Sequence, residues 1–333
     1  MTNSKIKLIE TYFPNNVLTN QMISEEFPNW NSEKITNKIG IQQRHIVSKN
    51  ETSLDMAFHV ANKAFDKYDK NKIDFIILCT QSPEYILPTT ACILQSKLGL
   101  GKNVGAFDYN LGCSGYIYGL GIAKSLIMSN IAKSILLIMS ETYTKHINKL
   151  DFANRSIFGD ASTATIIERD DEAHIHEFVV GTDGNGATNL IIPNGGARNS
   201  YDINAPLVDA SNGNKRTDND LFMNGPEIFN FTISVIPKLV EDVLEKNSTN
   251  LNDIDYFIFH QANKFMLDYL RKKLDIPVEK FYNKIDNIGN TVSSTIPIAL
   301  NDCILNGVFK KGDKVLLCGF GVGYSWGATI ITI

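Results

Sequence analysis

One cysteine of this chain stands where the surrounding sequence could make it reactive. Cys113 follows a strand-like run, residues 104–109, and a glycine corner at Gly112. The next residues, 116–128, contain Lys124 as their only ionic residue and so predict a helix that is buried on all faces. The cysteine would then lie at the positive end of a buried helix, where a thiolate is favoured over a thiol. This stretch alone also fits a structural cysteine, because buried cysteines are often only structural.

The composition is that of a soluble globular chain, and its charge implies no global attraction to nucleic acid or anionic membranes. The 333 residues are 43% hydrophobic and 20% charged, and the formal net charge is −4. No uncharged run is long enough to span a bilayer. The five cysteines show no CxxC spacing, which argues against a disulfide framework or a zinc site and fits a reducing compartment. Because the N-terminus also lacks the apolar core of a signal peptide, we expect a cytoplasmic protein.

Strand and helix patterns alternate on both sides of Cys113. Strands are expected at residues 6–11, 73–80, 104–109, 134–140 and 161–168, and helices at 53–68, 89–98 and 116–128. This alternation predicts a mostly parallel sheet with helices packed on it. Residues 143–156 and 194–220 are polar, and loops of this length are usually functional covers or mobile segments.

The second half of the chain repeats the pattern of the first. The matching runs are 73–78 with 254–259, 110–113 with 287–290, 136–137 with 316–317 and 164–167 with 328–331. Four matches in the same order, each at the corresponding place of an α/β pattern, indicate a duplicated α/β unit.

The duplication predicts that three residues far apart in the sequence share one site. Cys113 and Asn290 occupy equivalent corners of the two copies, so a pseudo-twofold axis would bring them together. His260 ends the strand expected at 254–259, and open α/β sheets bind their ligands at the carboxyl ends of strands. Each residue alone has an ordinary structural explanation, but the three together indicate nucleophilic catalysis. The glycine-rich turn at 319–323 lacks dinucleotide spacing and instead offers backbone N–H groups to a substrate oxygen.

Two further groups of charged or ligating residues carry weaker signals. His174 and His176 share one strand face, but no further ligand accompanies them, so we expect no metal site. A basic cluster follows His260 on an expected helix and consists of Lys264, Arg271, Lys272 and Lys273. Such a cluster is usually a solvated face, and it could also dock an acidic carrier protein.

Taken together, the motifs resemble those of β-ketoacyl-acyl-carrier-protein synthase III. They are Gly-Cys-Ser-Gly at 112–115, His-Gln-Ala-Asn at 260–263, Gly-Asn-Thr at 289–291 and Gly-Val-Gly-Tyr-Ser-Trp-Gly at 321–327. Further likeness at Gly40-Ile41, Arg44-His45-Ile46 and 158–160 extends the resemblance, in order, over essentially the whole chain. It implies an α/β thiolase-like fold with duplicated halves, 1–172 and 173–333, in a five-layer α-β-α-β-α arrangement, and it implies a homodimer.

The resemblance also implies a two-step acyl transfer without a cofactor. Cys113 would take an acyl group from an acyl-CoA or acyl carrier, and malonyl-acyl-carrier protein would lose carbon dioxide and attack the acyl-cysteine as an enolate. His260 and Asn290 would hold the malonyl thioester oxygen, and the backbone N–H groups of Cys113 and Val322 would hold the acyl-cysteine carbonyl. The implied substrate-binding residues are Lys38, Arg155, Leu87, Phe229, Asn263 and Gly321, and the implied carrier-docking residues are Lys264, Arg271, Lys272 and Lys273.

The sequence departs from the family pattern near the expected entrance of the site. Lys34 stands where the family has the tryptophan that stacks on the CoA adenine, and Lys38 stands where it has an arginine. Phe265 replaces a basic residue of the docking helix, and Val322 replaces a glycine. These changes bear on the identity of the acyl donor more than on the chemistry, and they suggest a specialised relative that serves a modified sugar or a secondary metabolite.

Three other functions remain alternatives at this point. A papain-like cysteine hydrolase also uses cysteine, histidine and asparagine, but its local cysteine signature and its secretory leader are absent. A silent partner subunit of a condensing pair typically loses the cysteine that this chain retains. An acyltransferase that passes the acyl group to an amine or alcohol without decarboxylation is not separated from a condensing enzyme by sequence.

Overall fold

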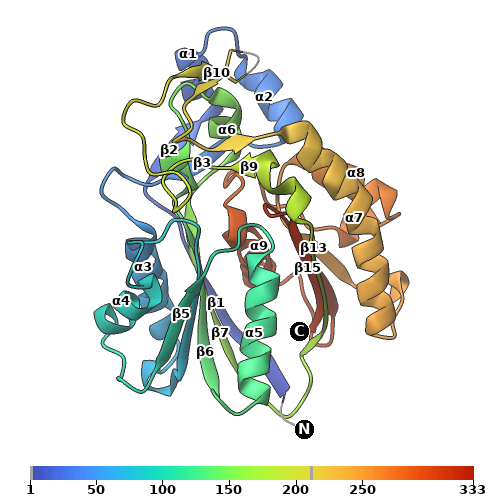
Figure 1. Ribbon diagram of the computed structural model, residues 1–333. Helices are drawn as coiled ribbons and strands as arrows, with labels where there is room; N and C mark the ends of the chain where they lie inside the picture. Colours follow the sequence, from blue (N-terminus) through green and yellow to red (C-terminus); the bar gives the residue numbers. More distant parts are fainter. Residues whose placement is uncertain (1–2, 211–212) are drawn as a thin grey trace.

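Two β-sheets form the frame of the molecule (Figure 1). The computed structural model describes residues 3–210 and 213–333. The first sheet contains β1 (Asn3–Tyr12), β4 (Phe75–Cys79), β5 (Gly105–Tyr109), β6 (Ser134–Glu141) and β7 (Ala161–Asp170). The second contains β8 (Ile175–Thr182), β13 (Tyr256–Phe259), β14 (Lys314–Gly321) and β15 (Ser325–Thr332).

The two sheets share one strand order. The first runs β1-β7-β6-β4-β5, and the second runs β8-β15-β14-β13 when it is followed in the same direction. A parallel bridge between Phe257 and Phe281 continues the second sheet at the place that β5 occupies in the first. The common order confirms the duplicated unit expected from the sequence repeat.

Most strands of each sheet run in one direction, as expected, but β7 and β15 run against the others, so both sheets are mixed. β4 pairs in parallel with β5 and β6, whereas β7 pairs antiparallel with β6 and β1. In the second sheet β13 and β14 are parallel, and β15 is antiparallel to both β14 and β8. The connection of β14 to β15, residues 322–324, is too short for a crossover helix, and a parallel pair would need one.

Three layers of helices enclose and separate the sheets (Figure 1). The outer face of the first sheet is covered by α3 (Ser53–Phe65) and α4 (Thr90–Lys97), and that of the second by α7 (Gly225–Lys246) and α8 (Lys264–Lys273). The middle layer consists of α5 (Gly115–Met128) and α9 (Thr295–Leu305), and both helices contact both sheets. This is the five-layer arrangement that the family resemblance implied. The near absence of charge in α5 fits its place between two sheets.

A smaller set of elements caps the end of the sheets where the parallel strands finish (Figure 1). They are β2 (Asn16–Thr19), α1 (Asn20–Glu26), α2 (Ser32–Ile39), β3 (Gln43–Ile46), α6 (Phe152–Ile157), β9 (Leu190–Ile191), β10 (Val208–Asp209), β11 (Lys215–Arg216) and β12 (Phe222–Met223). The polar stretches 143–156 and 194–220 contribute to this cap, although residues 211–212 lie outside the described part.

A buried arginine ties the cap together. Arg44 is fully buried, and its guanidinium donates to the carbonyl of Leu18, to Asn20 Oδ1 and to the carbonyl of Ser156. These three bonds join β2, α1 and α6 around one side chain.

No helix among residues 3–210 and 213–333 is long and apolar enough to cross a membrane.

Short 3-10 helices connect several of these elements. They are η1 (Lys70–Lys72), η2 (Tyr143–His146), η3 (Gly184–Asn189), η4 (Leu251–Asp253), η5 (Val278–Lys280) and η6 (Val292–Ser294). The last of them, η6, is separated from Asn290 by a single residue and leads directly into the middle-layer helix α9.

Candidate active site

Cys113 lies at the turn between β5 and α5, and only 6% of it is exposed. Two glycines allow β14 to pass directly against it. A Cβ atom on Gly321 would lie 2.8 Å from Cys113 Cβ and 2.9 Å from its Sγ, and one on Gly319 would lie 2.9 Å from the Cys113 carbonyl oxygen. The hydroxyls of Ser114 and Ser325 are 2.6 Å apart and join the start of α5 to β15. The glycines are therefore a steric requirement of the site.

The thiol of Cys113 is held in its neutral form, contrary to the expectation of a favoured thiolate. Burial, with a smaller electrostatic contribution from the nearby Glu141 carboxyl, raises the pKa of the Cys113 thiol to about 12. The backbone N–H groups of Cys113 and Val322 are directed at the sulfur and partly oppose this rise in pKa. The loss of hydration at Sγ thus outweighs these two backbone N–H groups in setting the pKa of the thiol.

His260 follows β13 and is almost fully buried. Its backbone N–H donates to the carbonyl of Cys318 at 2.8 Å, and its ring Nδ1 lies 2.8 Å from Thr295 Oγ1. Burial lowers the pKa of the His260 imidazole to about 3. The ring is therefore neutral at physiological pH and carries a proton on only one of its two nitrogens.

Asn290 is fixed by backbone bonds to the other half of the chain. Its N–H donates to the carbonyl of Ile157 at 2.9 Å, and its carbonyl accepts from the N–H of Gly159 at 3.0 Å. Gly289, with a φ of 74°, provides the left-handed turn that leads into this contact. The side-chain Oδ1 accepts the N–H of Val292 at 2.9 Å, so the amide NH₂ group is the end that can donate to a ligand.

Cys113, His260 and Asn290 line one cavity of about 130 Å³. Asn263, whose side chain caps α8, and Gly321 line the same cavity. The structure thus brings together the three residues that the sequence repeat predicted to share a site. A nucleophile, a neutral imidazole and an amide donor around an enclosed cavity are suited to acyl transfer through a covalent intermediate.

Most of the cavity wall is apolar and was not predicted from the sequence. The additional lining residues include Tyr143, Phe158, Leu190, Met223, Ile228, Met266 and Phe320. Tyr143 belongs to a stretch whose overall polarity hid its role, and Leu190 and Met223 come from the two short strands β9 and β12, which pair with each other. No periodicity marks two-residue strands, so only the tertiary fold could identify these residues.

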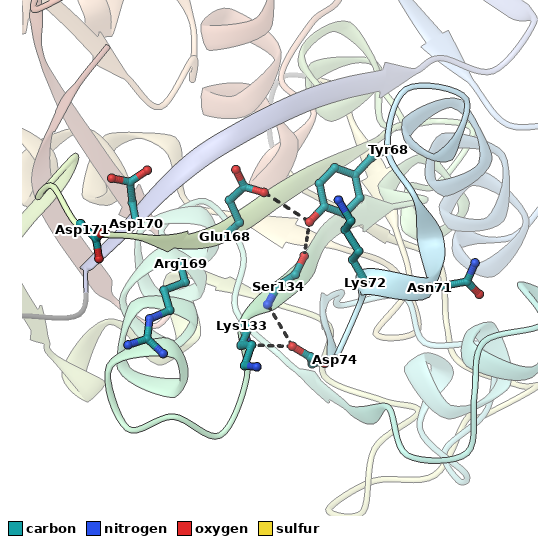
Figure 2. A pocket seen from close by; sticks show the side chains of 10 residues that line it. All are labelled: Tyr68, Asn71, Lys72, Asp74, Lys133, Ser134, Glu168, Arg169, Asp170 and Asp171. Atoms are coloured by element: carbon teal, nitrogen blue, oxygen red, sulfur yellow. Dashed lines mark hydrogen bonds between the residues drawn. The ribbon is translucent and has the colours of Figure 1, made fainter.

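A larger cavity, of about 640 Å³, lies at the opposite ends of β4 and β6 (Figure 2). Its polar groups are bonded to one another. Tyr68 Oη lies 2.9 Å from Ser134 Oγ and 3.3 Å from Glu168 Oε2, and Asp74 accepts the N–H groups of Lys133 and Ser134 (Figure 2). It contains no cysteine or histidine, and the chemistry of the chain is better placed at Cys113.

Comparison with known proteins gives the same assignment along the whole chain. The family model for 3-oxoacyl-[acyl-carrier-protein (ACP)] synthase III matches residues 107–184, and that for its C-terminal part matches residues 244–333. A β-ketoacyl-[acyl-carrier-protein] synthase III of Clostridium perfringens is 38% identical over 100% of both chains, and one of Fusobacterium nucleatum is 36% identical over 99% of both. The chain belongs to the β-ketoacyl-acyl-carrier-protein synthase III family.

Solved structures of synthase III superpose on nearly the entire chain. A crystal structure of 3-oxoacyl-(acyl-carrier-protein) synthase III has a TM-score of 0.98 and 42% identity, and covers 99% of this chain and 100% of its own. The synthase from Burkholderia xenovorans has a TM-score of 0.91 and 33% identity, with coverage of 100% and 95%. The thiolase-like synthase III fold expected from the resemblance is confirmed.

The residues that the resemblance assigned to substrate binding do not all lie at this cavity. Phe229 follows the cavity-lining Ile228 on α7, and Lys38 is exposed in the last turn of α2. Arg155 instead forms an ion pair with Glu26 and lines a separate surface groove of about 440 Å³. Leu87 is 80% exposed and lies outside the residues that line the cavity.

The four cations assigned to carrier docking are not equivalent. Lys264 forms an ion pair with Asp268 one turn along α8, and Arg271 donates to the carbonyl of Ile276 just beyond the helix. Lys272 and Lys273 are exposed at the C-terminal end of α8. The exposed positive charge of this helix therefore comes mainly from its last turn. In the described part of the chain, no group of three or more His, Cys, Asp or Glu side chains is placed to hold a metal ion.

Proposed function

We propose that this synthase III family member is an acyltransferase that condenses a Cys113-bound acyl group with malonyl-acyl-carrier protein. The observation that carries the proposal is the convergence of Cys113, His260 and Asn290 on one enclosed cavity. Residues 1–172 supply the nucleophile, and residues 173–333 supply the histidine and the amide. The proposed nucleophile and the proposed hydrogen-bond donors thus come from different copies of the duplicated unit.

The first step transfers an acyl group from an acyl-CoA or an acyl carrier to Cys113. The sulfur attacks the thioester carbonyl, the carbon–sulfur bond of the donor breaks, and the donor leaves as a thiol with the proton that Cys113 gives up. The N–H groups of Cys113 and Val322, which face the sulfur, stabilise the negative charge that develops on the acyl oxygen. Gly321 lies directly against Cys113, and Asn263 lines the same cavity.

The second step uses malonyl-acyl-carrier protein. Loss of carbon dioxide leaves an enolate, whose carbon attacks the acyl-cysteine carbonyl, and Cys113 departs as a thiolate that is then protonated. His260 and the amide NH₂ of Asn290 donate to the enolate oxygen, and one such donor is worth about 3 kcal/mol in the transition state. A neutral imidazole is suited to this role, and burial keeps His260 neutral. Both steps balance with the two thioesters and one proton, which water supplies to the Cys113 thiolate, so the proposal includes no cofactor.

We also propose a homodimer, because the chain exposes apolar side chains on the segment after β4 and in a groove beside α5. Tyr85, Ile86 and Leu87 are 59%, 94% and 80% exposed. An open groove of about 400 Å³ between α5 and β8 is lined by Ile117, Tyr118, Gly121, Ile122, Ser125, Leu126, Phe178 and Val180. In the first sheet, β5 is an edge strand, and one of its sides is unpaired among the described residues. A partner subunit would cover these surfaces and would bring Leu87 to a second copy.

All five cysteines are free, which fits a reducing compartment, and we place the enzyme in the cytoplasm.

The proposal is tested by the product. Purified enzyme is incubated with a panel of acyl-CoAs and malonyl-acyl-carrier protein, and intact-mass spectrometry follows both proteins. The expected result is an acylated enzyme and a carrier bearing a 3-oxoacyl group two carbons longer than the donated acyl group. An acyl group that passes to an amine or alcohol without release of carbon dioxide would instead establish the non-decarboxylating acyltransferase, which the named relatives do not favour.

A further inference from the structure

A threonine below the cavity contacts the ring of His260. Thr295 is the first residue of α9, is 3% exposed, and places its Oγ1 2.8 Å from His260 Nδ1. The same oxygen lies 3.1 Å from the carbonyl of Val292. A hydroxyl group has one proton to donate, so it can serve only one of these two acceptors at a time.

The acceptor to which the Thr295 hydroxyl donates determines whether His260 presents a hydrogen-bond donor or an acceptor to a ligand. If Thr295 donates to Nδ1, the single proton of the neutral ring must be on Nε2, which can then donate into the cavity. If Thr295 donates to the Val292 carbonyl, His260 must donate from Nδ1, and Nε2 presents a lone pair. The hydrogen bond of one ring nitrogen generally fixes the state of the other.

We infer that Thr295 is a positioning residue that donates its hydroxyl proton to His260 Nδ1 and so holds the ring proton on Nε2. The inference rests on the proposed condensation, because an Nε2 lone pair would repel the enolate oxygen that His260 has to stabilise. The contact with Nδ1 is also the shorter of the two, 2.8 Å against 3.1 Å. The ring has little freedom to change its partner, because Phe320 stands edge-on against it at 5.6 Å between centroids.

The tautomer can be measured directly in the natural chain. In NMR spectra of protein with ¹⁵N-labelled histidine, the signals of the two His260 ring nitrogens are assigned by comparison with His260→Ala. Their chemical shifts show which nitrogen carries the proton, because protonated and unprotonated imidazole nitrogens have well-separated shifts. The expected result is a proton on Nε2 and a bare Nδ1. A proton on Nδ1 would overturn the inference, and this measurement requires no substitution at position 295.

Three threonine variants separate positioning from packing. Thr295→Val keeps the shape of the side chain and removes the hydroxyl, and Thr295→Ser retains the hydroxyl. Thr163→Val is the matched control, because Thr163 is also fully buried and its hydroxyl has no partner among the described residues. We expect Thr295→Val to slow decarboxylation of a malonyl thioester by roughly tenfold to a hundredfold, the loss that follows when a metal-bound histidine loses the hydrogen-bond partner of its other ring nitrogen. Thr295→Ser and Thr163→Val should remain within a few-fold of the natural chain.

Acylation of Cys113 provides the second readout. It does not require an Nε2 donor, so Thr295→Val should acquire the acyl mass at the natural rate, whereas a packing defect would slow both steps. Equal decarboxylation by Thr295→Val and Thr163→Val would refute the role of Thr295 while leaving the condensation intact. If the natural chain itself releases no carbon dioxide, the proposed function fails, and the histidine tautomer still reports separately on Thr295.

Discussion

At the scale of single residues, the proposed nucleophile, Cys113, has surroundings that favour its neutral form. The pKa of the Cys113 thiol is raised to about 12 by burial, so its ionisation must be favoured by the arriving substrate and by the two N–H groups at the sulfur. A cysteine that is largely protonated at rest is protected from oxidation and alkylation, because these reactions require the thiolate. Its reactivity is thereby restricted to ligands that fill the cavity.

The raised pKa predicts the pH dependence of alkylation. Because the thiol ionises only as pH rises toward about 12, the rate of Cys113 modification by iodoacetamide should increase about tenfold per pH unit between pH 7 and pH 9. Peptide mapping by mass spectrometry separates this modification from that of the exposed Cys92, and Cys113→Ala provides the blank. A rate that levels off near pH 7 would show instead that Cys113 is a thiolate at rest.

Gly321 should tolerate no side chain. A Cβ atom there would lie 2.8 Å from Cys113 Cβ, so Gly321→Ala must displace either the cysteine or β14. A displacement of this order should slow acylation of Cys113 about a hundredfold, because nucleophilic attack depends steeply on geometry. Gly101→Ala is the control, since a Cβ atom there meets nothing within 4 Å. Rapid-quench mass spectrometry measures both variants, and a natural acylation rate in Gly321→Ala would contradict the proposed geometry.

At the scale of elements, the sequence predicted most where a pattern was long or repeated. The lack of charge after Cys113 identified α5, and the helix expected at 53–68 is α3, whose start is capped by reciprocal bonds between Thr52 and Asp55. The direction of β7 and β15 was not predictable, because an alternating pattern gives the position of a strand and not its orientation. The cavity wall from β9 and β12 was missed for lack of any periodic signal.

The helix α8 carries the next prediction, on carrier binding. Lys264 and Arg271 are engaged within the chain, so charge reversal at Lys272 and Lys273 should have the larger effect on an acidic carrier. We expect Lys272→Glu with Lys273→Glu to raise KM for malonyl-acyl-carrier protein several-fold at low salt, with little change for a small malonyl thioester. Salt should reduce the difference between the variant and the natural chain.

The matched control for this charge reversal is the same change at Lys310 and Lys311, which are exposed after α9. It alters the net charge equally and leaves α8 untouched. Equal effects of the two double variants, or an equal effect on small and carrier-bound substrates, would argue against docking at the end of α8. Phe265 is 61% exposed beside Phe229, with 5.4 Å between the ring centroids, so an apolar contact should persist at high salt.

At the scale of the whole molecule, duplication places the site where the two copies meet. Asn290 pairs with the backbone on either side of Phe158, so the second half of the chain is bonded directly to the first beside the cavity. The joint position of Cys113, His260 and Asn290 was predictable from the repeat, because equivalent corners of two related units must approach a common axis. The contact between the Thr295 hydroxyl and His260 was not predictable, because nothing in the sequence around Thr295 indicates that it faces a histidine.

The exposed apolar surface predicts the oligomeric state. Light scattering should give twice the chain mass of 37.1 kDa, because Ile86 and the groove between α5 and β8 would otherwise face water. Ile86 is 94% exposed within one chain, so Ile86→Lys should weaken the dimer without unfolding the subunit. A natural chain that is monomeric at micromolar concentration would refute the proposed homodimer.

The central claim is that Cys113 takes up the acyl group while His260 and Asn290 act on the second thioester. The most direct measurement compares acyl mass and release of carbon dioxide from malonyl thioester in Cys113→Ala, His260→Ala and Asn290→Ala. His260→Ala and Asn290→Ala should retain the acyl mass and lose decarboxylation by roughly a hundredfold or more. Cys113→Ala should show the reverse, with no acyl mass and part of the decarboxylation surviving. Full decarboxylation in His260→Ala and Asn290→Ala, or acyl mass that persists in Cys113→Ala, would contradict the account.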